Sequence, residues 1–265
     1  MTIPLQGAAG ESIFLWVSIM LVSTDGRIKL TLLCRLAVIA VGILLASVAQ
    51  AVTISPVIVK ITPAHRVVAV TVSNDSELPL TLQVDTLAWT QSGGEDRNEE
   101  NHDLLVVPPI AEIKPGDSQI FRVTLRRPVS AVAERAYRLV LDDVSEIQKK
   151  TEGIGVTFSF SHRLPVFVAG TGKIGPKPHL RMCPAPAQSG CVRLENEGDR
   201  FVKIMKLTVK GRNLTQDLGG TGTRILAGAW KQWTFAWPAN SNGPLIVNAE
   251  TSAGPLSIEL PNSSR

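Results

Sequence analysis

The residues of this sequence that could take part in chemistry do not form a recognisable catalytic motif. Gly170, Gly172 and Gly175 have the spacing of a dinucleotide-binding fingerprint, which requires a following helix whose N-terminus holds a pyrophosphate. Pro176 and Pro178 follow instead, and no alternation of strands and helices surrounds them. We therefore interpret this segment as a linker.

Acid–base and metal-binding side chains are equally scattered. The motifs G-x-S-x-G and H-E-x-x-H are absent, and no second Cys/His pair offers metal-ligand spacing. Asp142 and Asp143 are neighbours, but successive residues of a strand point to opposite faces. The four histidines stand alone, at positions 65, 102, 162 and 179. The sequence therefore predicts a protein that is not an enzyme and that needs no metal, ATP or other cofactor.

The N-terminal segment has the features of a secretory signal peptide. Basic residues precede an apolar run over 36–48, and Ala49-Gln50-Ala51 supplies a cleavage site of the A-x-A type. The run is too short to cross a bilayer. We expect removal of residues 1–51 and export of the remainder, with the true start downstream of Met1. An N-terminal membrane anchor is the alternative.

Cysteine usage fits export. Cys34 would leave with the signal peptide, so Cys183 and Cys191 would be the pair that remains. An even number of cysteines in an exported chain predicts a disulfide. Two free thiols are the alternative.

The mature chain is expected to be all-β. Its 17 prolines and 21 glycines punctuate short apolar runs, and turn clusters separate seven strand candidates in the first half, as in an immunoglobulin-like sandwich. Ser92–Asp103 is polar and is expected to be a solvated loop. A net charge of +4 without a dense basic stripe gives no support for nucleic-acid binding. The strands expected in the first half are 57–61, 67–73, 80–90, 104–107, 118–125, 136–141 and 155–169.

A second strand series follows a segment with the composition of a hinge. We expect an N-terminal immunoglobulin-like domain over 52–170, a hinge over 171–178 and a smaller C-terminal β-sandwich over 179–265. The strands expected in the second domain are 179–182, 191–194, 201–210, 223–226, 231–235, 245–249 and 256–260.

The stretch Gly153–Gly170 has an unusual pattern. Ile154, Val156, Phe158 and Phe160 alternate with small or polar residues, which predicts a strand with one apolar face. The pattern then changes to a continuous apolar run over 164–168, where Val166 and Phe167 are expected in the protein's own core. The inward-facing strand of any sandwich alternates in this way, so the pattern alone leaves open whether the strand also binds a partner.

The first domain contains a series of short motifs. They are Ser73-Asn74-Asp75, Leu78-Pro79-Leu80, Ala88-Trp89, Val107-Pro108-Pro109, Ile113-x-Pro115-Gly116, Ile120-Phe121-Arg122-Val123, Tyr137-Arg138-Leu139 and Leu164-Pro165-Val166-Phe167. These motifs resemble those of the periplasmic pilus chaperones of the PapD type. The Arg-Leu-Pro-x-Phe form of the last motif resembles the archaic branch of that family, whose members build simple adhesive pili.

The resemblance implies two immunoglobulin-like domains in a boomerang arrangement, located in the periplasm. It also implies that the last long strand of the first domain is lent to a pilin subunit that lacks a strand, and that an outer-membrane usher receives the subunit. The residues expected to be donated are Ile154, Val156, Phe158 and Phe160.

The family also binds the carboxylate of the subunit's C-terminus with two basic residues. Here Pro165 occupies the usual lysine position, and Arg163 lies two residues earlier on the same face. Ile58 occupies the usual arginine position, and Lys60 is the nearest cation on that face. The resemblance therefore implies Arg163 and Lys60 as the carboxylate anchor.

Two other classes of protein stay open. A structural or adhesive pilus subunit should have a free N-terminal donor segment, whereas the donor-like strand here is internal. A generic two-domain binding protein of the cell envelope is the third class. The sequence also leaves open whether the unloaded protein associates with itself through its apolar strand.

Overall fold

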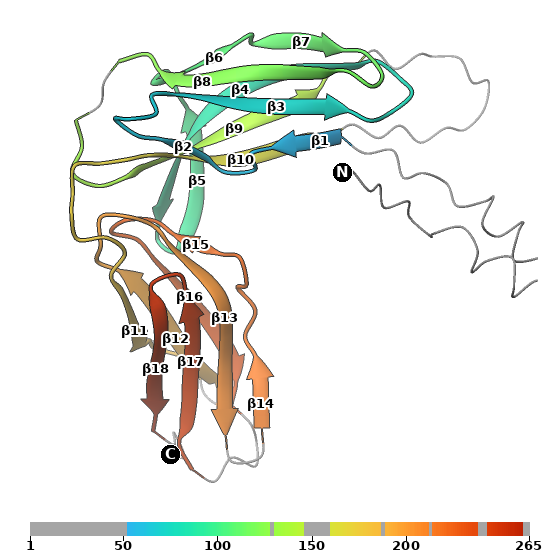
Figure 1. The fold of residues 1–265 in the computed structure, drawn as a ribbon. Coiled ribbons are helices and arrows are strands. Elements are labelled where there is room, and N and C mark those ends of the chain that lie inside the picture. Colours follow the sequence, from blue (N-terminus) through green and yellow to red (C-terminus); the bar gives the residue numbers. More distant parts are fainter. Residues whose placement is uncertain are drawn as a thin grey trace, which may run out of the picture. The chain divides into compact units, whose positions relative to one another are not determined.

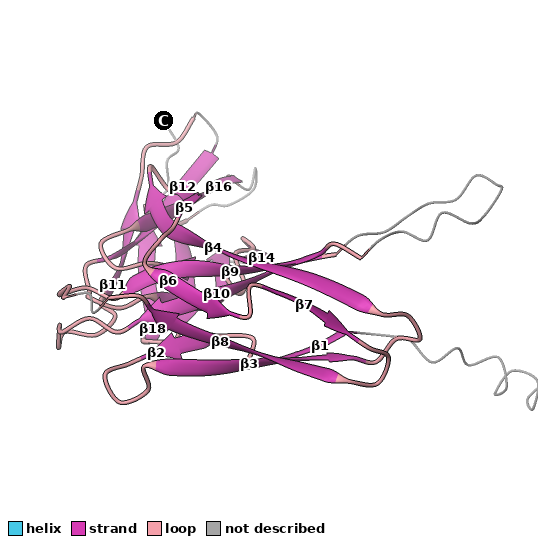
Figure 2. Cartoon of the chain, turned by 90° about the horizontal axis from the view of Figure 1, so that it is seen from above, coloured by secondary structure: helices cyan, strands magenta, loops and turns pink. Residues whose placement is uncertain are grey.

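The computed structural model describes residues 52–127, 130–145, 160–186, 189–211, 214–237 and 243–261. All the regular elements in these ranges are strands, as Figures 1 and 2 show. The described ranges accordingly contain no helix that is long and apolar enough to cross a membrane. The expected signal peptide lies outside the described residues. The fold is all-β, as predicted from the sequence.

Strands β1 to β10 form two sheets. One has the order β1-β3-β8-β6, and the other has the order β2-β10-β9-β4-β5 with β7 also paired to β4. The bounds are β1 Val52–Ser55, β2 Val59–Ile61, β3 Val67–Asn74, β4 Leu80–Ser92, β5 Glu95–Glu100, β6 Leu104–Val107, β7 Ile110–Ile113, β8 Ser118–Leu125, β9 Arg135–Asp143 and β10 Ser161–Val168.

Alternating side chains build the core between these sheets. Val70 and Phe121, on paired strands of one sheet, are fully buried, as are Leu139 and Val166 on paired strands of the other. All four belong to one apolar cluster. The opposite face of the second sheet is not simply solvated, because Trp89 and Phe167 belong to a second cluster.

Strands β11 to β18 also form two sheets. One has the order β11-β12-β16, and the other has the order β14-β13-β17-β18 with β15 paired to β13. Strand pairing thus changes between Val168 and Pro178, and the expected division into two domains stays a prediction. The bounds are β11 Pro178–Met182, β12 Ser189–Asn196, β13 Val202–Gly211, β14 Leu214–Asp217, β15 Arg224–Ile225, β16 Trp230–Ala236, β17 Leu245–Thr251 and β18 Gly254–Leu260.

The expectation of a loop over Ser92–Asp103 is wrong. Strand β5 lies within it and pairs with β4 from Ser92 opposite Glu95 to Leu87 opposite Glu100. Gly93 and Gly94 form the turn with φ values of 64° and 85°, which glycine adopts without a steric penalty. Every residue of β5 is exposed, so the strand lacks the apolar alternation by which a sequence reveals a strand.

Candidate functional site

Strand β10 has an edge that is only partly covered by another strand. On one side, β10 pairs along its whole length with β9, from Ser161 opposite Asp142 to Val168 opposite Arg135. On the other side, the parallel strand β2 pairs only with residues 166–168. No strand among the described residues pairs with residues 161–165 on that side. We call residues 161–165 the open edge.

Two hydrogen bonds fix the direction of the main-chain groups on β10. The N–H of Asp143 donates to the C=O of Phe160 on the β9 side (2.9 Å), and the N–H of Ala169 donates to the C=O of Ile61 on the β2 side (2.9 Å). Because successive residues of a strand direct these groups to opposite sides, the odd-numbered residues face β2 or the open edge. Arg163, like Ser161, therefore offers its N–H and C=O to an added strand.

Phe160 is the one expected donor residue that lies within the described part of the chain. It directly precedes β10, and 59% of its surface is exposed. Val144, just after β9, is also exposed, so apolar side chains are accessible where the open edge begins. Ile154, Val156 and Phe158 lie outside the described residues, and their role stays a prediction.

The apolar run after the open edge belongs to the core, which confirms the expectation for Val166 and Phe167. Val166 is fully buried between the sheets of β1 to β10. Phe167 points to the other face, where its ring stacks on Phe201 with 4.1 Å between centroids. The Trp89 ring is 6.0 Å from Phe167. Together these three rings form an aromatic cluster on the outer face of the sheet that contains β10.

The two expected anchor cations lie on this outer face. Lys60 is opposite Phe167 in the ladder between β2 and β10, and Arg163 is four residues before Phe167 on the same face. Four residues of strand span about 13 Å, so the two cations mark separate positions along the sheet. Their joint role as an anchor stays a prediction.

Arg138 is another cation of this face, and it was not among the residues expected from the sequence. It lies opposite Pro165, with its guanidinium 3.5 Å from the centroid of the Trp89 ring and 3.5 Å from the Asp96 carboxylate. Burial lowers the pKa of Arg138, Asp96 raises it, and the charges of Arg224 and Arg163 lower it again. The alternation of Arg138 with the buried Tyr137 and Leu139 was the signal that could have placed it on the outer face.

Arg224, on β15, completes a group of three cations with Arg138 and Arg163, which we call the cation group. Its Nε is buried and has no hydrogen-bond partner among the described residues. Burial lowers the pKa of Arg224, and its guanidinium lies 5.9 Å from the ring centroid of Phe201. A buried donor without a partner costs about 1–3 kcal/mol. The positive charges of Arg163 and Arg224 both act on Arg138.

Lys60 belongs to a different environment. It lines a cavity of about 340 Å³ together with Glu134, Phe167, Arg200 and Phe201, among other residues. Glu134 Oε1 accepts a hydrogen bond from the N–H of Phe201 (3.1 Å). Burial raises the pKa of Glu134, while the hydrogen bond from Phe201 and the charges of Arg200 and Lys60 lower it. Lys60 therefore has an acidic neighbour in Glu134, and Arg138 of the cation group has one in Asp96.

The glycine-rich segment after β10 is bound by the protein's own carboxylate. Asp199 accepts hydrogen bonds from the N–H groups of Ile174 and Gly175 (2.8 Å each). A Cβ at Gly172 would collide with the Asp199 carboxylate. The N–H groups that a phosphate would need are thus already used, in agreement with the interpretation of this segment as a linker.

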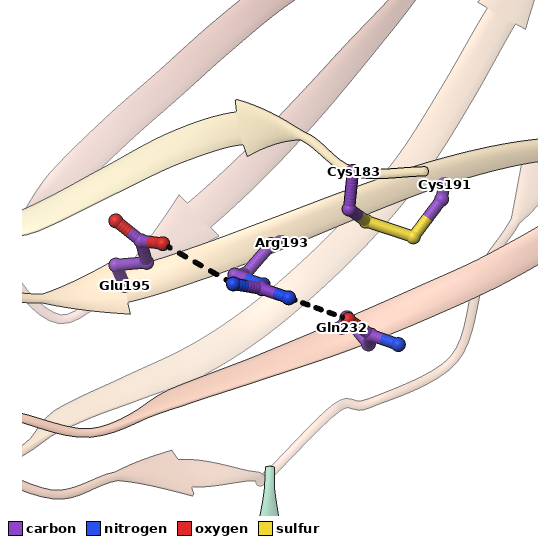
Figure 3. Close-up of a disulfide and its surroundings, with 5 residues drawn as sticks. All are labelled: Cys183, Cys191, Arg193, Glu195 and Gln232. Carbon is purple, nitrogen blue, oxygen red and sulfur yellow. Dashed lines mark hydrogen bonds and ion pairs between the residues drawn. A yellow bond between two sulfur atoms is a disulfide. The ribbon is translucent and has the colours of Figure 1, made fainter. Parts of the chain in front are cut away.

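Cys183 and Cys191 form the predicted disulfide, which joins the end of β11 to β12 (Figure 3). Two residues after Cys191, Arg193 lies 3.9 Å from the centroid of the Trp230 ring and donates a hydrogen bond to Gln232 (3.1 Å). The disulfide joins the end of β11 to β12, and the hydrogen bond from Arg193 to Gln232 joins β12 to β16. In the part of the chain that the structure describes, no cluster of His, Cys, Asp or Glu could hold a metal ion.

Comparison with known proteins gives a family for the sheets that carry the open edge. Residues 51–172 match the family model described as "Pili and flagellar-assembly chaperone, PapD N-terminal domain". These residues contain β1 to β10. No match was found among curated proteins.

Solved structures with a similar fold include several chaperones. The CsuC–CsuE chaperone–tip adhesion subunit complex of Acinetobacter baumannii is 22% identical, with a TM-score of 0.58 over 79% of this chain and 98% of the other. The Salmonella enterica SafA pilin–SafB chaperone complex is 14% identical, with a TM-score of 0.57 over 81% and 99% of the two chains. The E. coli chaperone DraB is 16% identical, with a TM-score of 0.53 over 80% and 98%. The N-terminal sheets therefore match the family model of the PapD N-terminal domain, and the chain shares the fold of these chaperones.

Proposed function

We propose that this protein is a periplasmic chaperone that binds a pilin subunit at the open edge of β10, stabilises it and delivers it to an outer-membrane usher. The observation that carries the proposal is the partial pairing of β10: on the side away from β9, no strand among the described residues pairs with Ser161 or Arg163. Strand addition gains affinity from main-chain hydrogen bonds and specificity from alternate side chains. A subunit that lacks a strand would thereby complete its own sheet.

The donated side chains in this proposal are Ile154, Val156, Phe158 and Phe160. Each would contribute roughly 1.5–3 kcal/mol when fully buried in the subunit. Four such residues would contribute about 6–12 kcal/mol before the cost of ordering the segment. The exposure of Phe160 in the unbound protein supports this role, because a side chain that is already buried would have little to gain.

The carboxylate of the subunit's C-terminus is proposed to bind the cation group, with Arg163 as the first contact. Arg163 is exposed and lies on the open edge itself. Arg163 and Arg224 both lie close enough to Arg138 to lower its pKa. Arg138 and Arg224 lie over rings of the aromatic cluster, so an anion would be held in a poorly solvated place. Lys60 lies further along the face and would contribute less.

The proposed location and branch rest on further features. The expected signal peptide and the disulfide both fit an oxidising compartment, and the fold similarity to the Csu chaperone complex agrees with the archaic form of the motif over 163–167. The division into an N-terminal domain over 52–170 and a C-terminal domain from 179, with the hinge between, is proposed from the change of strand pairing.

Purification of the tagged full-length chain from the periplasm of its own host tests the proposal. We expect a stoichiometric protein that sequencing identifies as a pilin, and its loss from the Phe158→Glu and Phe160→Glu variants. Val67→Glu is the matched control, because Val67 is also an exposed apolar residue but lies on β3. A protein that is polymerised on the cell surface, or a pilin that is retained by both donor variants, contradicts the proposal.

A further inference from the structure

We propose that Pro165 divides the edge of β10 into a part held by β2 and a part kept open for the partner strand. This inference rests on the proposed function, because the open part has a use only if a partner strand is added there. Pro165 lies at the boundary itself: β2 begins at Val59, opposite Val166, and the open edge, residues 161–165, ends at Pro165.

The first step concerns the direction in which Pro165 points. It belongs to the odd-numbered residues of β10, whose main-chain groups face β2 or the open edge, as the bond from Ala169 to Ile61 shows. Proline has no N–H to donate. The N–H that proline lacks would have faced β2. The ladder between β10 and β9 is therefore continuous past Pro165. A proline is tolerated in a strand at such a position.

The second step explains where β2 begins. One position before Val59 in the same register, Ile58 would lie opposite residue 165. In a parallel ladder, a residue bonds the two residues that flank its partner, so the N–H of residue 165 would donate to the C=O of Val57. Pro165 cannot make this bond. Val57 is accordingly outside any strand and is 61% exposed.

The third step is the consequence for the partner. With an N–H at position 165, β2 could continue by one step and bring the N–H of Val57 to the C=O of Arg163. That carbonyl is one of the groups that an added strand needs. Pro56 has no N–H, so the extension would stop there. Pro165 thus prevents β2 from pairing with the open edge. Arg163 is then the last residue of β10 whose N–H and C=O are both available to the partner strand.

The fourth step relates the point where the partner strand ends to the cation group. A partner strand that ends beside Arg163 brings its terminal carboxylate to the cation group. Arg138 lies directly across the ladder from Pro165. The partner strand would therefore end at the same position along β10 as the cation group. Pro165 is therefore a positioning residue that sets the register of the partner, while the cations bind its end.

The test uses the full-length protein and Pro165→Ala, which restores the N–H. In the free variant, we expect the amide of Val57 to exchange with deuterium at least tenfold more slowly than in the wild type, as measured by NMR. We expect the dissociation constant for the pilin subunit, measured by competition, to rise about tenfold. Pro165→Val, whose side chain is favoured in strands, should give the same two results if Pro165→Ala folds poorly.

Pro255→Ala is the matched control, because Pro255 also lies in an edge strand, β18. It should change neither the exchange of Val57 nor pilin binding. An unchanged Val57 amide in the position-165 variants, or pilin binding equal to that of the wild type, overturns the role of Pro165. A wild-type protein that binds no pilin contradicts the proposed function instead, and the exchange of Val57 in the free protein then still tests the division of the edge.

Discussion

Asn74 and Asn196 form the same hydrogen bonds at the ends of strands in the two halves of the protein. Each is the last residue of its strand, β3 or β12, and is essentially fully buried. The side-chain N–H₂ donates to the C=O four residues later, which is Leu78 (2.8 Å) or Arg200 (2.7 Å). The side-chain oxygen accepts from the N–H two residues later, at 3.1 Å in both cases. The same connection from strand to turn is thus used twice.

Replacement of either residue by alanine should destabilise the protein strongly. Asn74→Ala or Asn196→Ala would leave buried main-chain groups without partners, at a cost of about 1–3 kcal/mol in the free energy of unfolding. Urea titration followed by tryptophan fluorescence would measure the loss. Asn98→Ala is the control, because Asn98 lies on the exposed strand β5, and it should change stability by less than about 0.5 kcal/mol. Equal effects at buried and exposed positions would refute this assignment.

Gln91, near the end of β4, should hold β15 in place. Its side-chain N–H₂ donates to the C=O of Arg224 (2.8 Å), and its oxygen accepts from the N–H of Leu226 (2.9 Å). Gln91→Ala should therefore accelerate the exchange of the Leu226 amide at least tenfold and reduce stability by about 1–2 kcal/mol. Gln119→Ala is the control, because the bond from Gln119 goes to the next residue in the chain. An unchanged Leu226 amide would mean that other contacts fix β15.

The disulfide should stabilise the folded protein to a moderate extent. Cys183 and Cys191 are eight residues apart, and the chain-entropy model gives about 2–3 kcal/mol for a loop of this length. The double variant Cys183→Ser/Cys191→Ser should show this loss in urea titration, while the wild type should show it only with added reductant. Pilin binding should persist in the variant, since the disulfide lies in the sheet of β11 and not on the open edge. Loss of binding without loss of stability would contradict this separation.

Stability should depend on pH through Glu134. Burial raises the pKa of this carboxyl above its usual 4.5, so the folded state binds the proton more tightly than the unfolded state does. Its contribution to stability is therefore fully present below pH 4.5 and is lost as the pH rises through the folded pKa. Glu134→Gln retains an oxygen that can accept from the N–H of Phe201 and removes the buried charge. The stability of this variant relative to the wild type should increase over that window.

Urea titrations at pH 4 to 8 would measure this difference. Glu112→Gln is the matched control, because it removes an exposed carboxylate on β7. A difference between Glu134→Gln and the wild type that stays constant with pH, or that shrinks as the pH rises, would contradict the assigned cause.

The strands that sequence alone could predict are those with one buried and one exposed face. β3, β8 and β17 alternate in burial along their length, and most of their buried positions are apolar. The acidic β5 could not be predicted, because both its faces are exposed and it is held by pairing with β4. The disulfide was predictable because only one pair of cysteines was expected in the exported chain.

The candidate site could be predicted only in part. The resemblance to pilus chaperones implied Arg163 as an anchor, and the sequence pattern indicated the apolar alternation before it. Arg224 joins Arg138 only because β15 and β9 are brought together in the fold, which no local pattern reports. The extent of the open edge depends on the register between β2 and β10. That register also separates Lys60 from Arg163, which a count of residues along each strand could not show.

The cation group gives the sharpest prediction for the site. A charge-assisted hydrogen bond to a carboxylate contributes about 1.5–3 kcal/mol, so Arg163→Ala should weaken pilin binding by roughly tenfold to a hundredfold. Lys60→Ala should have a smaller effect, because Lys60 lies further along the face and beside Glu134. Binding would be measured by competition at several salt concentrations, and the wild type should lose affinity with salt more steeply than Arg163→Ala.

A double-mutant cycle would identify the group that Arg163 binds. A peptide of the pilin's C-terminal strand would be compared with the same peptide carrying a C-terminal amide. If Arg163 binds the carboxylate, amidation should weaken binding to the wild type and leave binding to Arg163→Ala nearly unchanged, because the second change removes an interaction already lost. Additive effects of the two changes would mean that Arg163 contributes only a general positive charge, and the carboxylate would then have to bind elsewhere, with Lys60 as the next residue to test.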